Sequence, residues 1–157
     1  MTTKKYIFAI LLLCIAIPFL SCKKEKYEGE LYTETPLNAF VQLSDDSVYL
    51  VFLFVYSCPH CQNSVENLNE YEQSGVVDKV IGLTIQDSVA ARYFTDNFYP
   101  DFTIIQCDIE EFFAFNNRFP TSLLIKKGKI EKVLRGELPT ATDFYRKNKR
   151  KIEQCEE

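Results

Sequence analysis

Histidine is nearly absent from this chain of 157 residues, in which His60 is the only one. Structural zinc sites combine four cysteine or histidine ligands, usually as two closely spaced pairs. Here one such pair exists, Cys58 and Cys61, and there is no second cysteine or histidine pair to complete the set. A site of that type is therefore disfavoured. Binding of copper or zinc by the two cysteines themselves stays open as an alternative.

The chain also lacks a stripe of basic residues. Its 18 Lys and Arg are outnumbered by 22 Asp and Glu, which gives a formal net charge of −4 at pH 7. Nucleic-acid-binding domains carry clustered positive charge that neutralises phosphates. We therefore expect no nucleic acid among the partners of this protein.

The N-terminal apolar run, residues 6–19, is too short to cross a membrane comfortably, since a spanning helix needs about 20 residues. Placed behind Lys4 and Lys5, the run is typical of the apolar region of a secretion signal. Phe19-Leu20-Ser21-Cys22 follows directly and resembles a bacterial lipobox, in which a small residue precedes a cysteine that is lipidated. A plain signal anchor with an incidental thiol is the alternative.

These features predict three parts of the chain. Residues 1–21 are expected to be a lipoprotein signal peptide, 22–36 a flexible tether anchored through lipid on Cys22, and 37–157 a single domain. The domain would then lie outside the cytosol, on the periplasmic or cell-surface side of a bacterial envelope. Disulfides persist in such a compartment.

The strongest motif is Cys58-Pro59-His60-Cys61. It follows residues 48–56, a run that is apolar on both faces and therefore typical of a central buried strand. It also opens a predicted helix over residues 59 to about 73, with proline at a first-turn position where it is tolerated. Two cysteines separated by two residues at a strand-to-helix junction are typical of a dithiol–disulfide couple.

Strands and helices alternate through the rest of the domain. Further strands are expected at 79–85, 102–107, 121–126 and 129–134, and further helices at 37–43, 87–98, 108 to about 115 and from 139 onward. Lys127-Gly128 would join the last two strands as a hairpin. This order predicts an α/β domain whose sheet is covered by helices on both faces.

Phe119-Pro120-Thr121, ahead of the fourth strand, completes a resemblance. With the cysteine motif it resembles the thioredoxin superfamily, in which the CxxC pair faces a cis-proline loop. The strand–helix unit at about 102–119, inserted before that loop, is similar to the TlpA/ResA branch of membrane-tethered thiol-disulfide oxidoreductases. The resemblance implies a thioredoxin-like fold with a central mixed sheet.

The resemblance also implies an activity and its partners. The protein would exchange disulfides with extracytoplasmic protein thiols or disulfides, and a redox partner protein, expected in the membrane, would supply or remove electrons. No organic cofactor and no metal is implied. The alternative functions are a metal-handling lipoprotein and a non-catalytic surface lipoprotein, each of the same fold.

The two cysteines are expected to have different roles. Cys58, at the N-terminus of a helix, would be the nucleophile, because helix N–H groups stabilise a thiolate. Cys61, one turn further in and facing the core, would be the resolving thiol. The resemblance implies that the peptide bond before Pro120 is cis. It also implies that Phe119 and Thr121 bind the substrate, which would pair with the backbone by strand addition.

His60 and Phe52 leave the redox direction open. Pro-His is the dipeptide of DsbA-type oxidants, in which the nucleophile has a pKa of about 3.5 against about 7 in thioredoxin. His60 is therefore expected to tune the couple, the alternative being an exposed residue without an electrostatic role. Many thioredoxins bury an acid six residues before the first cysteine, where this chain has Phe52. Glu110 and Glu111 are candidate substitutes for it.

Two further cysteines lie in the domain. Cys107 is expected to be a buried small residue at a strand end, and Cys155 an exposed residue near the charged C-terminus. A disulfide between them is the alternative.

Overall fold

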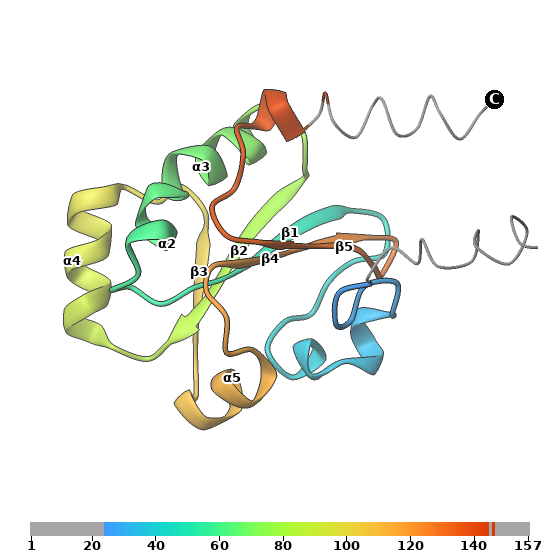
Figure 1. The fold of residues 1–157 in the computed structure, drawn as a ribbon, viewed down its shortest axis with the longest axis horizontal. Coiled ribbons are helices and arrows are strands. Elements are labelled where there is room, and N and C mark those ends of the chain that lie inside the picture. Colours follow the sequence, from blue (N-terminus) through green and yellow to red (C-terminus); the bar gives the residue numbers. More distant parts are fainter. Residues whose placement is uncertain (1–23, 145, 147–157) are drawn as a thin grey trace, which may run out of the picture.

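The computed structural model describes residues 24–144 and residue 146. Its elements, in chain order, are η2 (Tyr32–Glu34), η3 (Pro36–Ala39), β1 (Val48–Leu53), α2 (Pro59–Asn63), α3 (Val65–Gln73), β2 (Lys79–Ile85), α4 (Ser88–Phe98), β3 (Thr103–Cys107), α5 (Ile109–Phe115), β4 (Thr121–Lys126) and β5 (Lys129–Arg135). Residues 141–144 are again helical. The predicted α/β order, including the strand–helix unit β3–α5 before Pro120, is confirmed (Figure 1).

The five strands form one mixed sheet in the order β3-β2-β1-β4-β5. β1, β2 and β3 run parallel, whereas β4 is antiparallel to β1 and β5 is antiparallel to β4. Lys127 and Gly128 both have positive φ, 51° and 70°. A two-residue turn with positive φ at both positions matches the twist of the strands that it joins, and the predicted hairpin is confirmed.

Both faces of the sheet are buried. Successive side chains of a strand point to opposite faces, and β1 uses this alternation to enter two separate cores. Leu50, Phe52 and Phe54 pack with residues of α3, α4 and the helical residues 141–144. Val51 and Leu53 pack with residues of α5 and of the N-terminal segment on the other face. This arrangement accounts for the strand that is apolar on both faces, and Figure 1 shows helices on both sides of the sheet.

β1 ends at Leu53 rather than at residue 56. Leu53 lies opposite Thr121, the first residue of β4. The residue before Thr121 is Pro120, which has no N–H to donate to the ladder. The antiparallel pairing of β1 with β4 therefore stops there, although the Phe54 N–H still donates to the Leu83 carbonyl of β2.

The helix predicted over residues 59–73 is divided into α2 and α3 at Ser64. The Ser64 hydroxyl donates to the carbonyl of His60 at 2.9 Å and accepts a hydrogen bond from the Leu138 N–H at 3.4 Å. Serine that bonds to the carbonyl four residues before it loosens a helix. The cysteine motif consequently lies in a short helix of its own.

The N-terminal part of the structure lies against the domain, although residues 22–36 were expected to be a flexible tether. Leu31 forms an isolated bridge with Lys129 of β5. Tyr32 is 5 % exposed, and its hydroxyl bonds to both the N–H and the carbonyl of Leu43. Burial of Tyr32 with Leu37 in the second core accounts for this packing. The helix expected at 37–43 is reduced to η3, a single 3-10 turn.

Several predictions concern residues outside the described part of the chain. They are the signal peptide at 1–21, the lipidation of Cys22 and the state of Cys155. In residues 24–144 and 146, no helix is both long and apolar enough to cross a membrane.

Candidate active site

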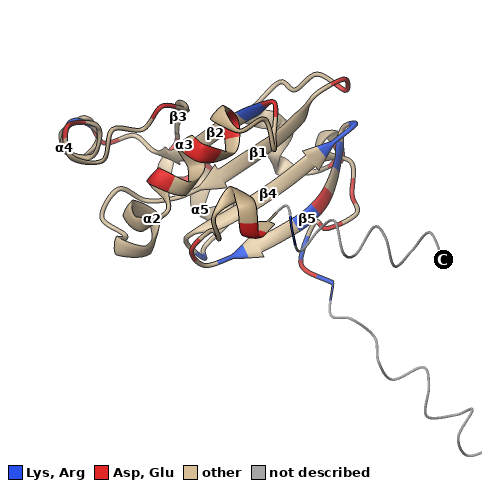
Figure 2. Ribbon diagram, turned by 90° about the horizontal axis from the view of Figure 1, so that it is seen from above, with Lys and Arg blue, Asp and Glu red and all other residues tan. Residues whose placement is uncertain are grey.

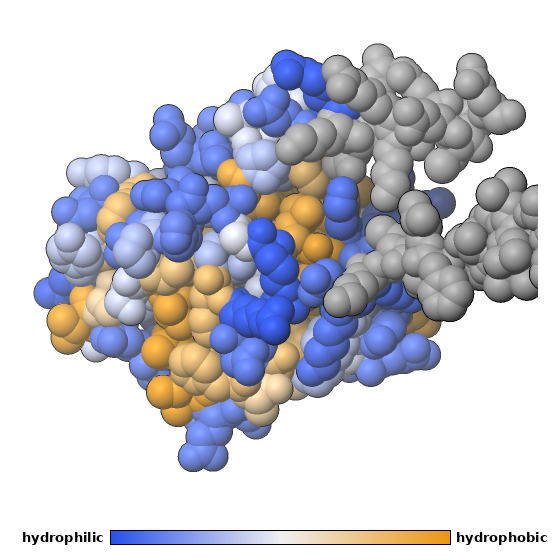
Figure 3. Space-filling model, in the orientation of Figure 1, coloured by the Kyte–Doolittle hydropathy of each residue, from blue (hydrophilic) through white to orange (hydrophobic). Residues whose placement is uncertain are grey.

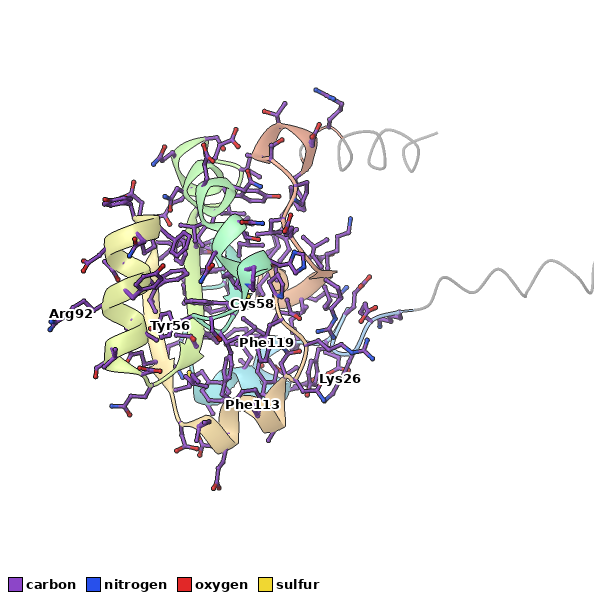
Figure 4. All side chains as sticks on the ribbon, turned by 60° about the vertical axis from the view of Figure 1, so that its left-hand side comes forward. Lys26, Tyr56, Cys58, Arg92, Phe113 and Phe119 are labelled. Atoms are coloured by element: carbon purple, nitrogen blue, oxygen red, sulfur yellow. The ribbon has the colours of Figure 1, made fainter. Side chains whose placement is uncertain are left out.

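The cysteine motif and the proline loop lie at the same end of the sheet. β1 precedes Cys58, β4 follows Pro120, and the two strands pair at Leu53 and Thr121. Figure 4 shows Cys58 and Phe119 on this side of the molecule, with Phe113 of α5 beyond them. The Phe119–Pro120 peptide bond is cis, as predicted.

Cys58 is the N-cap residue of α2 and has an extended backbone, with φ −82° and ψ 115°. Its side chain is half-buried. The Sγ atom accepts a hydrogen bond from the Cys61 N–H at 3.3 Å. A thiolate at this position would gain from the same donor, since hydrogen bonds to the charged form stabilise that form.

Cys61 is fully buried. Burial, together with the hydrogen bond and the charge of Cys58, raises the pKa of the Cys61 thiol far above its ordinary value. Cys61 therefore stays protonated at neutral pH, and both thiols of the motif are free. The structure thus places one accessible sulfur and one buried sulfur within a single helical turn.

We expect iodoacetamide to alkylate Cys58 at least about tenfold faster than Cys61 at mildly alkaline pH, because only a thiolate reacts and Cys61 stays a thiol. Quantitative mass spectrometry of peptides from the folded, reduced protein measures both rates. The unfolded chain is the control, in which the two rates should converge. Equal rates in the folded protein would contradict the assignment of the two roles.

Within residues 24–144 and 146, no carboxylate acts on Cys61 in place of the buried acid that is missing at Phe52. Phe52 is fully buried and its ring stacks on Phe54 at 5.3 Å. Glu111 instead contributes, after burial, to raising the pKa of Cys107 to about 11. The carboxylates of Glu110 and Glu111 lie in the exposed first turn of α5 and do not contribute to the raised pKa of Cys61. The expectation that they act on the resolving thiol is not supported.

Cys107 is buried at the end of β3, as predicted. Its raised pKa keeps it a neutral thiol, which suits a packing role. Among the described residues, no group of three or more His, Cys, Asp or Glu side chains lies close enough to hold a metal ion.

His60 forms an ion pair that the sequence analysis missed. Its side chain is 70 % exposed, and Nδ1 lies 2.6 Å from Oε1 of Glu137. The same oxygen accepts a hydrogen bond from Nδ2 of Asn63 at 3.0 Å. The bond from His60, followed by that from Asn63, lowers the pKa of Glu137, which is therefore ionised at neutral pH. His60 is exposed, as the alternative prediction had it, but its side chain has a bonding partner in Glu137.

No signal in the sequence links these two residues. Glu137 lies 77 positions beyond His60, so no local spacing connects them. They meet because β4 is antiparallel to both β1 and β5. β5 therefore ends at the same end of the sheet as β1, which leads into α2.

Arg135, the last residue of β5, holds the proline loop in place. Its Nη1 donates to Oδ1 of Asn116 at 2.9 Å and to the hydroxyl of Thr121. Asn116 and Thr121 both donate to the carbonyl of Arg118 at 2.6 Å. Thr121 is 1 % exposed, so its side chain supports the loop from within rather than facing a substrate.

Phe119 belongs to an aromatic group with α5. Its ring stacks on Phe112 at 5.4 Å with an interplanar angle of 10°, and it meets the edge of Phe113 at 5.7 Å. Phe112 is fully buried, whereas Phe113 is 42 % exposed. The aromatic group is therefore partly a surface, and Figure 4 shows Phe113 and Phe119 on the same side of the molecule as Cys58.

Comparison with known proteins identifies the fold. No protein-family model and no curated protein matches the sequence, but solved structures do. StoA from Bacillus subtilis gives a TM-score of 0.55 at 20% identity, over 66% of this chain and 83% of that one. The fold is thioredoxin-like. A thioredoxin-family thiol:disulfide interchange protein from Chlorobium tepidum gives 0.53 at 18% identity, over 65% of this chain and 77% of that one.

A secreted disulfide oxidoreductase from Mycobacterium tuberculosis, homologous to DsbE of E. coli, also matches the thioredoxin-like domain. Its TM-score is 0.53 at 13% identity, over 62% of this chain and 77% of that one. The predicted fold class is therefore confirmed: a five-stranded mixed sheet flanked by helices, related in structure to proteins of the StoA and DsbE type. At these identities the likeness concerns the fold alone.

Proposed function

We propose that this protein is an extracytoplasmic thiol-disulfide oxidoreductase that acts on protein substrates through Cys58 and Cys61. The observation that carries the proposal is the asymmetry of the two sulfurs. Cys58 is accessible and its Sγ accepts a helix N–H, whereas Cys61 is buried and protonated. Thiol-disulfide exchange requires one sulfur that attacks first and a second that attacks later.

The reduction of a substrate would proceed in two displacements. The Cys58 thiolate attacks one sulfur of the substrate disulfide, forming a mixed disulfide and releasing the other substrate sulfur, which takes up a proton. Cys61 then loses its proton and attacks Sγ of Cys58, forming the Cys58–Cys61 disulfide and releasing the second substrate thiol. Two electrons pass to the substrate. Oxidation of a substrate dithiol is the same sequence in reverse.

The surface beside Cys58 suits a polypeptide substrate. Phe119 precedes the cis proline and is only partly buried, and Phe113 exposes its ring next to it. Figure 3 shows apolar side chains gathered between α4 and α5, on the side from which these loops emerge. We propose that an extended segment of the substrate pairs with the backbone at Phe119 by strand addition. An apolar substrate side chain would rest on the exposed aromatic rings.

The location and partners are part of the same proposal. Lipidation of Cys22 after removal of residues 1–21 would hold the domain on a bacterial envelope membrane, and stable anchoring takes more than one acyl chain. A membrane protein with its own dithiol would exchange electrons with the Cys58–Cys61 couple. The support for the anchor is the apolar run at 6–19 followed by Phe19-Leu20-Ser21-Cys22.

Trapping the mixed disulfide tests the proposed function. In the full chain with Cys61→Ser, the second displacement is blocked, so substrate proteins from a bacterial envelope extract should stay covalently bound to Cys58. Non-reducing electrophoresis with mass spectrometry identifies them. The matched control carries both Cys58→Ser and Cys61→Ser and should trap nothing. Absence of covalent partners, together with stoichiometric copper or zinc on the unmodified protein, would favour the metal-handling alternative.

A further inference from the structure

The ion pair between His60 and Glu137 bears on the direction of the redox reaction. The Pro-His dipeptide predicts an oxidising couple because an imidazolium close to the nucleophile stabilises its thiolate, and hence the reduced form. That expectation concerns a histidine without a counter-charge. In this protein, Oε1 of Glu137 lies 2.6 Å from Nδ1 of His60.

Several contacts fix Glu137 at this place. It lies two residues beyond the end of β5, and its Oε1 also accepts a hydrogen bond from Asn63, on the same helix as His60. Arg135 is the nearest cation along the chain, but its guanidinium is bound to Asn116, Thr121 and Glu25. Its bonding directs it to the proline loop and the N-terminal segment rather than to Glu137. The charge of Glu137 therefore lies against His60 and Asn63 of α2.

We propose that Glu137 is a positioning residue that holds His60 in an ion pair and thereby makes the Cys58–Cys61 couple less oxidising than its Pro-His dipeptide implies. This inference rests on the proposed function, because it assigns a direction to the same couple. The couple would work closer to the reducing end of the range that thioredoxin-like proteins cover.

The sign of the effect follows from the charges alone. For either protonation state of His60, the pair with an ionised Glu137 carries one more negative charge than His60 would carry alone. The lowered pKa of Glu137 keeps that charge in place at neutral pH. A negative charge near Cys58 disfavours its thiolate and therefore destabilises the reduced form relative to the disulfide.

The contact between His60 and Glu137 is not needed for the stability of the fold. The side chains of His60 and Glu137 are 70% and 44% exposed, and ion pairs so accessible to water contribute little to folding. His60, however, lies two residues after Cys58 in the first turn of α2, and Glu137 is bonded to it. The main consequence of the pair is therefore expected in the potential of the couple.

Two single variants and their combination test the proposal in the full chain. Glu137→Gln removes the negative charge and keeps the shape of the side chain. It should shift the equilibrium with glutathione by about threefold to tenfold towards the dithiol form, where tenfold corresponds to about 30 mV. The rate of Cys58 alkylation should also reach half of its maximum at a lower pH.

At a pH where the imidazole is protonated, His60→Gln should shift both measurements in the opposite direction, because it leaves the Glu137 charge without a counter-charge. The double variant removes both groups of the pair and should fall between the two single variants. A role limited to holding α2 in place would instead move both single variants in the same direction. Opposite signs therefore separate an electrostatic role from a structural one.

Glu131→Gln is the matched control, since Glu131 is an exposed residue near the start of β5, whereas Glu137 follows the end of that strand. It should leave both measurements unchanged. Figure 2 shows that β5 carries acidic and basic residues along its length, so removal of one charge leaves a mixed strand.

An unchanged equilibrium in Glu137→Gln, or shifts of the same sign in Glu137→Gln and His60→Gln, would overturn the inference. Neither result would touch the proposed function, which is tested by the covalent capture of substrates in Cys61→Ser. If the unmodified protein formed no Cys58–Cys61 disulfide in glutathione buffers, the proposed function and the inference would both fail. The two failures are thus distinguishable.

Discussion

Replacing Cys58 with Ser is expected to abolish thiol-disulfide exchange. A hydroxyl cannot form the mixed disulfide, and Cys61 cannot take over the attack because it is fully buried and protonated. The rate should fall by about a thousandfold or more, as when the nucleophile of a covalent enzyme is removed. The measurement is the rate at which the protein, recycled by dithiothreitol, reduces the disulfides of a model protein substrate.

Cys107→Ser is the control for this experiment, because Cys107 is buried at the end of β3 and has no part in the proposed reaction. Its rate should equal that of the unmodified protein once the fraction of folded protein is taken into account. Substantial activity in Cys58→Ser would show that another thiol attacks the substrate and would contradict the assigned nucleophile.

The second large effect is expected on stability, from Phe54→Ala. Phe54 is fully buried and its ring contacts those of Phe52, Tyr56 and Phe94 at centroid distances of 5.2–5.4 Å. It also packs closely on Gly82, where an added Cβ would come within 2.9 Å of the ring. Removing the ring leaves a cavity between β1, β2 and α4 and should lower the free energy of unfolding by about 3–5 kcal/mol.

Unfolding in urea or guanidinium chloride, followed by circular dichroism, measures this loss. Phe113→Ala is the matched control, because it removes the same ring from a position that is 42% exposed. It should cost about 1 kcal/mol. Similar losses for the two variants would contradict the placement of Phe54 in the core.

The order of elements was predictable because each strand and helix carries its own pattern. β1 is apolar on both faces, which only a central strand between two covering layers requires. The hairpin was predictable from Lys127-Gly128 between two apolar runs. The cysteine motif was recognisable for the same reason, since its chemistry depends on residues that are neighbours in the sequence.

Features that depend on pairing between distant segments were not predictable. The end of β1 at Leu53 is set by Pro120 on the paired strand, which the sequence of β1 does not reveal. The division between α2 and α3 depends on Ser64, whose hydroxyl bonds both within the helix and to Leu138. Glu137 reaches His60 only because β5 ends at the same end of the sheet at which β1 leads into α2.

The N-terminal segment at residues 29–32 covers part of the free edge of β5 and so limits contact between copies of the protein. β5 is an edge strand, and exposed strand edges are templates for pairing with other chains. Gly29, Glu30 and Tyr32 make backbone hydrogen bonds to residues 128–130 and so occupy the start of that edge. The segment therefore shortens the length of edge open to another sheet. This covering protects the domain against pairing with another sheet along that part of the edge.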